Sequence, residues 1–470
     1  MKPAVRIVSA SSLCILAAAL VAACDNTPQA TAPIAVPAFG HSVNHGNPDC
    51  ALNGRGGASG PYDFLCAIEI PGNPLTSSQK TWVEQSNARY FVSDASNNGV
   101  DVVDVRTHTY IGRVGGMAGN VGTGGGTAAT NGAGPNSFVS APVLRGRGHD
   151  DDDHGWGHDD EHGGFDTRVL FVSDGNATVQ VVDMERLQIL TSISVAKSDC
   201  DGGTATTHFC GRSNEIDYDP VHHIVAVSNP NPLSYVKCTA AGANCTTAAG
   251  ITAAGAAIPS YLTFISARHP YRILGQLSLG PGSAEGHVWV PVLNRFLLPI
   301  TGAAGGPFIQ TINPRTMTIE SQRTYDCVAL TGTASNASNN LRVIGNNLWA
   351  QLCGRPMRLN ARTGDVLNVI TQVGTGDEDW INRGDGTFLV TGNDAVTAVS
   401  SVGIMNAFTG QWLQNVPNIA GASPSAFAET NEIFTRVLFA AATDATNRCV
   451  VKGQGCVVVF ARTVVPGHKH

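Results

Sequence analysis

Short apolar runs alternate with turns rich in Gly, Asn and Asp along most of the chain, and two of these stretches repeat each other openly. Within each run, β-branched and apolar residues alternate with polar ones, which is the pattern of a half-buried strand. The first copy consists of Tyr90–Asp94, Gly99–Asp104 and Tyr110–Gly112, and the second of Leu170–Asp174, Thr178–Asp183 and Leu187–Leu190. Each copy therefore predicts three short strands joined by tight turns.

Five weaker copies follow, each built around two central apolar runs. These runs are Ile224–Ser228 with Leu262–Ile265, Phe296–Ile300 with Phe308–Ile312, Leu348–Leu352 with Met357–Leu359, Phe388–Thr391 with Val402–Met405, and Val437–Ala440 with Val457–Phe460. The units recur at roughly the 40–50-residue period of a propeller blade once insertions are discounted. Blades packed around an axis bury both faces of each sheet and leave only short edges. We therefore expect an all-β, seven-bladed β-propeller, with a flat two-sheet sandwich as the alternative.

The last unit ends near Arg462 with only three strands, so it lacks one strand of a four-stranded blade. Upstream of the first unit, Leu65–Gly72 has the pattern of an outer strand followed by a connecting loop. We expect residues 65–70 to supply the missing outer strand and so close the ring.

Val100–Asp104 and Val179–Asp183 share the pattern V-x-V-V-D, and Gly132–Ser137 partly matches a G-x-x-P-x-G turn. In these stretches the chain resembles the YVTN-type propeller. The resemblance covers most of residues 60–462, and its specific motifs lie in the first two units. It implies a seven-bladed propeller. The sequence has neither the Gly-His…Trp-Asp pattern of WD repeats nor the repeated double glycine of kelch repeats.

The first 24 residues have the layout of a bacterial lipoprotein signal peptide. Lys2 and Arg6 precede an apolar stretch, residues 7–23, which ends in small residues directly before Cys24. This arrangement resembles the lipobox, whose cysteine thiol carries the lipid. An ordinary cleaved signal is the alternative. A transmembrane anchor is disfavoured, because the apolar run falls short of a clean span of about 20 residues.

We expect a signal peptide over residues 1–23 and a lipidated Cys24 with a flexible tether over 24–45. The tether is rich in Pro, Ala and Thr and almost free of charge, so it cannot bury a core. The propeller should occupy residues 46–465, followed by a short tail, 466–470. Lipidation would place the protein in the bacterial cell envelope, on the periplasmic side, anchored to the inner or the outer membrane.

The overall composition suits a turn-rich β-protein, with 14% charged residues and 53 glycines. The net charge of −7 gives no reason to expect nucleic acid as a partner. Stretches 117–133, 145–166 and 239–258 have the composition of loop insertions, which we expect to decorate one rim of the propeller. We expect a monomer whose partners are the membrane, through the lipid, and an envelope protein or a small ligand.

Ten cysteines remain when Cys14, in the signal, and Cys24 are set aside, and they fall in neighbouring pairs. An even number of thiols behind an export signal predicts disulfides. Sequential pairing would join Cys50 with Cys66, Cys200 with Cys210, Cys238 with Cys245, Cys327 with Cys353, and Cys449 with Cys456. None of these spacings is CxxC, which argues against zinc and thioredoxin-like sites.

One insertion is conspicuously rich in metal-binding residue types. Residues 149–162 contain four histidines, His149, His154, His158 and His162, together with seven carboxylates. Imidazole and carboxylate groups are ligands for zinc, nickel, copper and manganese. The alternative, which we favour for biological function, is a solvated low-complexity insertion that binds metal only adventitiously.

A second candidate metal site comes from the expected starts of the innermost strands. Glu215, Glu285, His287 and Asp379 are our choices there; Asp217, Asp377, Glu378, Glu429 and Asn431 are further polar residues at these positions. Such a set resembles the calcium-centred propeller hydrolases of the gluconolactonase and paraoxonase kind, which implies a bound cation at the channel. With the histidine-rich insertion also considered, the cofactor we weigh for the chain is a divalent cation (calcium, zinc or nickel). The alternative is that these are ordinary loop carboxylates, since blade mouths are polar in any propeller.

The sequence contains no Gly-x-Ser-x-Gly elbow, His-Glu-x-x-His motif, P-loop or haem-attachment motif. The six tryptophans show no repeated docking motif of the quinoprotein kind. We therefore favour a binding or scaffold protein over an enzyme. A metal-dependent hydrolase or lactonase with a site at the channel mouth is the alternative, because fold analogy alone cannot choose between the two classes.

Overall fold

The computed structural model describes the strands of the repeats and part of their connections within residues 50–462. The described residues are 50, 61–118, 134–143, 168–175, 177–196, 208–209, 213–230, 236–238, 251–253, 260–280, 282–302, 306–335, 337–374, 376, 378–417, 422–438, 449 and 454–462. The chain divides into two compact units, residues 1–44 and 45–470, and every described residue belongs to the second.

Several sequence predictions lie outside the described residues. They are the signal peptide with Cys24 and the tether, most of the three insertions, the histidines 149, 154, 158 and 162, the side chains of the cysteines at 200, 210, 238 and 245, and the tail. None of the helices in the described ranges has the length and apolarity that crossing a membrane requires.

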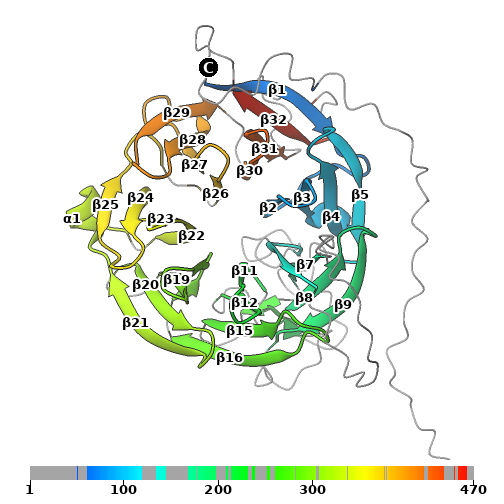
Figure 1. Cartoon of the computed structure of the whole chain (residues 1–470), viewed down its shortest axis with the longest axis horizontal. Coiled ribbons are helices and arrows are strands. Elements are labelled where there is room, and N and C mark those ends of the chain that lie inside the picture. The colour runs from blue at the N-terminus through cyan, green and yellow to red at the C-terminus, as the bar shows by residue number, and fades with distance from the viewer. Residues whose placement is uncertain are drawn as a thin grey trace, which may run out of the picture. The chain divides into compact units, whose positions relative to one another are not determined.

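Seven of the eight antiparallel sheets formed by the described strands are arranged as the blades of a propeller (Figure 1). Blade 1 contains β2 (Thr81–Glu84), β3 (Arg89–Asp94), β4 (Gly99–Asp104) and β5 (Thr109–Gly115); blade 2 contains β6 (Phe138–Pro142), β7 (Arg168–Asp174), β8 (Thr178–Asp183) and β9 (Gln188–Ser194); blade 3 contains β11 (Ile216–Asp219), β12 (Ile224–Asn229), β15 (Ser260–Ser266) and β16 (Ile273–Gly280); blade 4 contains β17 (Ser283–Ala284), β18 (Val288–Val290), β19 (Arg295–Thr301), β20 (Phe308–Asn313) and β21 (Thr318–Thr324).

The remaining blades complete the ring. Blade 5 contains β22 (Ser338–Ile344), β23 (Asn347–Leu352), β24 (Arg355–Asn360) and β25 (Val366–Val369); blade 6 contains β26 (Asp379–Asn382), β27 (Thr387–Asn393), β28 (Ser400–Asn406) and β29 (Trp412–Pro417); blade 7 contains β30 (Pro424–Phe427), β31 (Glu432–Val437), β32 (Cys456–Arg462) and β1 (Tyr62–Glu69). A small sheet of β10 (His208–Phe209), β13 (Val236–Cys238) and β14 (Ile251–Ala253) and one short helix, α1 (Cys327–Thr331), lie outside the blades.

The seven-bladed fold is confirmed, and the repeated apolar runs are the second, third and fourth strands of the blades. The bounds predicted for one strand are wrong: the sequence pattern places the run at Val437–Ala440, whereas the strand, β31, begins at Glu432 and ends at Val437. The innermost strands escaped the repeat analysis because they are short and carry polar residues, as in β26, Asp-Trp-Ile-Asn. Their sequence pattern alone does not stand out from a loop.

The predicted ring closure is confirmed. β1 pairs antiparallel with β32, from Tyr62 opposite Arg462 to Glu69 opposite Cys456. The hydroxyl of Tyr62 donates a 2.6 Å hydrogen bond to Asp385 of blade 6, and the guanidinium of Arg462 lies 2.7 Å from the same carboxylate. The closing strands are therefore joined to the neighbouring blade as well as to each other.

A repeated turn explains why the third strand of most blades ends in Asp or Asn. The side chain of this residue accepts hydrogen bonds from backbone N–H groups two and three residues later, which satisfies the turn locally. The fourth residue after it then adopts a left-handed conformation. The five such acceptors are Asp104, Asp183, Asn313, Asn360 and Asn406, followed by left-handed His108, Leu187, Met317, Gly364 and Gly410.

The hydrophobic core lies between adjacent blades. At one interface, Phe91 and Val102 of blade 1 pack with Leu170 and Val182 of blade 2, and all four side chains are fully buried. Burying side chains of this kind contributes about 1.5–3 kcal/mol each. Because a blade is a radial sheet, alternate residues of each strand face its two neighbours, and this alternation is what the period-2 sequence pattern records.

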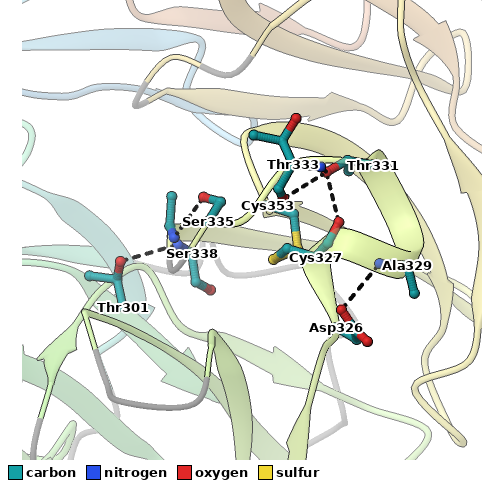
Figure 2. Close-up of a disulfide and its surroundings, with 10 residues drawn as sticks. Thr301, Asp326, Cys327, Ala329, Thr331, Thr333, Ser335, Ser338 and Cys353 are labelled. Carbon is teal, nitrogen blue, oxygen red and sulfur yellow. Dashed lines mark hydrogen bonds between the residues drawn. A yellow bond between two sulfur atoms is a disulfide. The ribbon is translucent and has the colours of Figure 1, made fainter.

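Three predicted disulfides are present: Cys50–Cys66, Cys327–Cys353 and Cys449–Cys456. Figure 2 shows Cys327 at the start of α1 joined to Cys353, which follows β23. The carboxylate of Asp326 caps the helix by accepting a 3.1 Å hydrogen bond from the N–H of Ala329. The cap and the disulfide together hold the connection between blades 4 and 5.

The three insertions are not attached to one rim, as predicted, but to strand ends on both faces of the ring. Residues 145–166 connect the first and second strands of blade 2, β6 and β7. Residues 117–133 connect blade 1 to blade 2, and residues 239–258 connect the second and third main strands of blade 3, β12 and β15. Neighbouring strands run in opposite directions, so the first of these connections joins strand ends on one face of the ring, and the other two join strand ends on the opposite face.

Candidate functional site

A cavity of about 330 Å³ lies among the innermost strands of blades 1 to 6. Five aromatic side chains line it: Trp82, Phe138, Tyr218, Trp289 and Trp380. Charged side chains from several blades join them. Side chains that are far apart in sequence meet here because every blade sends its first strand to the centre of the ring (Figure 1).

Four lining residues occupy equivalent positions of their innermost strands, each opposite the third residue of the second strand. They are Trp82 of blade 1, Asp217 of blade 3, Arg342 of blade 5 and Trp380 of blade 6. Blades 1 and 6 flank blade 7, whereas blades 3 and 5 flank blade 4 (Figure 1). Trp82 and Trp380 therefore come from the blades beside blade 7, and Asp217 and Arg342 come from the blades beside blade 4, which itself contributes Trp289.

Lys80 lies two residues before Trp82 in the chain, and its side chain links blades 1, 3 and 6. Its Nζ lies 3.1 Å from Oε1 of Glu215 in blade 3 and 2.8 Å from Oε2 of Glu378 in blade 6. These side chains are only 7–8% exposed. The hydroxyl of Ser137, from blade 2, donates a 3.1 Å hydrogen bond to the other oxygen of Glu215.

The electrostatics of Glu215 follow from this contact. Burial acts to raise the pKa of its carboxyl, but the positive charges of Lys80 and Arg342 and the hydrogen bonds from Lys80 and Ser137 outweigh burial and hold that pKa below its ordinary value. Glu215 is therefore ionised at neutral pH and firmly paired with a cation.

The carboxyl groups of Asp217 and Asp379 have raised pKa values, in contrast to Glu215. Oδ2 of Asp217 accepts a 2.5 Å hydrogen bond from the backbone N–H of Trp289, yet burial raises the pKa of this carboxyl to about 6. Nε of Arg342 lies 3.1 Å from Oδ1 of Asp379, and burial still raises the pKa of Asp379 despite this cation. Removing a carboxylate from water disfavours its charged form, and partners compensate only in part.

Two indole N–H groups of cavity-lining tryptophans have no hydrogen-bond partner among the described residues. Nε1 of Trp289 and Nε1 of Trp380 are buried, and neither forms a hydrogen bond with any described residue. The Trp289 side chain is held edge-to-face against Phe296, with ring centroids 5.3 Å apart. Because buried tryptophan N–H groups usually find an acceptor, these two donors beside one cavity are candidates for hydrogen bonds to a ligand or to ordered water.

Glu215, Glu285, His287 and Asp379, the residues of the predicted cation site, do not form a group that could hold a metal ion among the described residues. Glu215 is paired with Lys80, and Asp379 is paired with Arg342, so both carboxylates already face a protein cation. His287 is buried, and its Nε2–H donates a 3.0 Å hydrogen bond to the carbonyl of Ala226. Burial lowers the pKa of His287 to about 4, so the ring is neutral.

The structure also places the other polar residues that the sequence predicted at the strand starts. Across the part of the chain that the structure describes, no group of three or more His, Cys, Asp or Glu side chains could hold a metal ion. Glu285 is half-buried between β17 and β18, and Asp377 lies outside the described residues. Glu429 and Asn431 follow β30, at its end rather than its start, and Glu429 pairs with Arg106 on the surface. The hydrolase hypothesis loses its predicted site.

Sequence reasoning missed Lys80, Arg342, Arg383 and the cavity tryptophans. A signal was present: Lys80, Glu215 and Glu378 each stand two residues before an equivalent strand position. Aligning the short innermost strands would have placed these three charges at one level of the channel. His287 and Asp379 lie one residue out of that register, and a shift of one residue turns a side chain to the opposite face of a sheet.

No protein-family model matches the chain, and no characterised protein shows significant sequence similarity to it.

Proposed function

We propose that the protein is an exported, lipid-anchored β-propeller of the bacterial envelope that binds a small ligand in its central cavity. The observation that carries this proposal is the convergence of aromatic and charged side chains from six blades on one cavity of about 330 Å³. That volume lies at the lower end of the roughly 300–1,000 Å³ typical of small-molecule sites, which are mostly apolar with a few placed polar groups. The rigid ring would act as the scaffold.

The sequence around Cys24 supports export and lipidation, and three disulfides among the described residues favour an oxidising compartment. The V-x-V-V-D motifs, which form the third strands β4 and β8, support kinship with YVTN-type propellers. The tether after Cys24 would keep the domain near the membrane while leaving the cavity accessible.

Metabolic labelling with an alkyne fatty acid in a bacterial host tests the anchor. The wild-type chain should incorporate label and fractionate with membranes, and Cys24→Ala should abolish both. Cys14→Ala, which alters the other cysteine of the signal region, is the matched control and should remain labelled. Labelling that survives Cys24→Ala would contradict lipidation at this residue.

A thermal-shift screen of the full-length protein against a library of neutral, anionic and cationic metabolites tests the binding function. Compounds that bind in the cavity should raise the melting temperature of the wild type but not of Val139→Phe, which places a larger side chain at the cavity wall. Val396→Phe, at a 93%-exposed position, is the matched control and should respond like the wild type. If no compound distinguishes Val139→Phe from the wild type, the proposed function fails.

A further inference from the structure

We infer that the ligand of the central cavity is a neutral, polyhydroxylated ring compound, that is, a mono- or disaccharide. This inference rests on the binding function proposed above and names the chemical class of the ligand. It follows from three properties of the cavity: its charges, its free hydrogen-bonding groups and the placement of its aromatic side chains.

The charges around the cavity largely cancel, which argues against a charged ligand. Lys80 is already paired with two carboxylates, and Arg342 is paired with Asp379. In the buried part of the wall, both cations are therefore already paired with carboxylates and would not be available to an anion. The third lining cation, Arg383, is exposed to water, which weakens its attraction for an anion. A cation would have to approach Arg342 and Arg383, and both line the cavity. Like charges at close range disfavour such binding.

The hydrogen-bonding groups that remain require a ligand with donors and acceptors on neighbouring atoms. The indole N–H groups of Trp289 and Trp380 need acceptors, and the Trp289 side chain is at least nine-tenths buried, with 6% of the residue exposed. The carboxyl group of Asp217 accepts from the backbone N–H of Trp289 through one oxygen, and a carboxylate has further acceptor capacity. Hydroxyl groups satisfy both demands, because each one donates and accepts.

The aromatic side chains provide the apolar surface that such a ligand needs. Trp82 comes from blade 1 and Trp380 from blade 6, on either side of blade 7, whereas Asp217 and Trp289 come from blades 3 and 4. Arg342 of blade 5 adjoins Trp380, because it is paired with Asp379. A sugar ring has an apolar face of C–H bonds and a rim of hydroxyl groups. One ring in the cavity could therefore place its C–H face toward Trp82 and Trp380 and its hydroxyl groups toward the polar side, at Asp217 and the indole N–H of Trp289, where their placement would set specificity.

Isothermal titration calorimetry on the full-length protein in detergent micelles tests the inference with matched pairs of probes. Glucose, galactose, N-acetylglucosamine, maltose and cellobiose are the neutral probes. Galacturonate and glucosamine carry one negative or one positive charge on the same ring skeletons, and citrate and choline are charged compounds without a sugar ring. At least one neutral sugar should bind, and its charged counterpart should bind more weakly.

Variants that retain ring size locate the binding site. Trp380→Phe and Trp289→Phe each remove one indole N–H and keep an aromatic ring, so each should weaken binding of the neutral sugar about 3- to 10-fold, the effect of one lost hydrogen bond. Trp412→Phe, on the outer strand β29, should leave the affinity unchanged. Melting temperatures of the variants show whether a loss of binding reflects unfolding, and Asp217→Asn provides a second change on the polar side.

The outcomes separate this inference from the function on which it rests. Binding of a charged probe but of no neutral sugar, with loss of that binding in Trp380→Phe, would overturn the sugar assignment and retain the cavity as a binding site. Neutral-sugar affinity that is unchanged in folded Trp380→Phe, Trp289→Phe and Asp217→Asn would also overturn it, because the sugar would then bind elsewhere. Absence of binding by every probe, together with a thermal-shift screen that finds no cavity ligand, would refute both proposals.

Discussion

Replacing Lys80 with Met should destabilise the propeller more than any other single change of a charged side chain in the channel. Met preserves most of the length and apolar volume of Lys but removes the ammonium group. Glu215 and Glu378 would then face each other in a buried site with no cation between them. The variant tests whether the charges that join blades 1, 3 and 6 are a structural element of the ring.

The magnitude follows from the geometry. At 2.8 and 3.1 Å, and with an effective dielectric constant of about 20, each contact has a gross attraction of about 5–6 kcal/mol, most of which offsets the desolvation of the three charges. Removing one partner of a buried ion pair leaves that desolvation without compensation and typically costs about 3–5 kcal/mol. We expect Lys80→Met to lower the free energy of unfolding by about this amount.

Urea unfolding of the full-length protein between pH 5 and 8 is the assay. In the wild type, the pKa of Glu215 is held below its ordinary value, so its contribution is fully present above that ordinary value and is lost only at lower pH. In Lys80→Met, burial and repulsion by Glu378 should raise this pKa instead, so the variant should gain stability as the pH falls from 8 to 5. Adding Glu215→Gln and Glu378→Gln should restore most of the loss.

An exposed ion pair provides the control. Arg106 lies 2.8 Å from Glu429, with about half of each side chain exposed, and Arg106→Met should cost less than about 1 kcal/mol. If Lys80→Met costs as little as Arg106→Met, or if its stability does not depend on pH, the reasoning is refuted.

Three further results are expected. Asp385→Ala removes the carboxylate that accepts hydrogen bonds from both closing strands, so it should cost about 3 kcal/mol and increase hydrogen exchange in β1; unchanged exchange there would show that the closure does not depend on this residue. Replacing Cys327 and Cys353 together with Ser should cost about 3 kcal/mol in unfolding without reductant, given the separation of 26 residues, and a loss below about 1 kcal/mol would contradict it. Burial raises the pKa of Asp217 to about 6, so ionising this carboxyl disfavours the folded state. The cost is absent below about pH 4, increases toward pH 6 and is complete above it. The stability of Asp217→Asn relative to the wild type should therefore increase between pH 4 and 7, and a constant difference would argue against a buried, ionising Asp217.

Much of the fold was predictable because it depends on local patterns. Alternation of apolar and polar residues marks each strand, and the residue that ends the third strand forms a turn with its own neighbours. The repeat in the first two blades recurs as Asn313, Asn360 and Asn406, where Asn replaces the Asp of the V-x-V-V-D motif. The last unit lacked one strand and an isolated strand preceded the first unit, so pairing the two was the simplest way to complete a blade, and this made the closure predictable. Neighbouring cysteines paired for the same reason: their separation in sequence is short.

The candidate site was not predictable in the same way. The sequence determined where strands begin, which face of each strand is apolar and that polar residues occupy the centre of the ring. Only the tertiary structure decided that Lys80 lies between Glu215 and Glu378, because these residues are separated by more than 130 positions in sequence and meet only when seven radial sheets share one axis. It also decided that His287 and Asp379 face neighbouring blades, because one residue of register determines which interface a side chain joins. The physical reason is that hydrogen bonding within a blade is local, whereas the partners of a buried charge are set by the packing of distant blades around the channel.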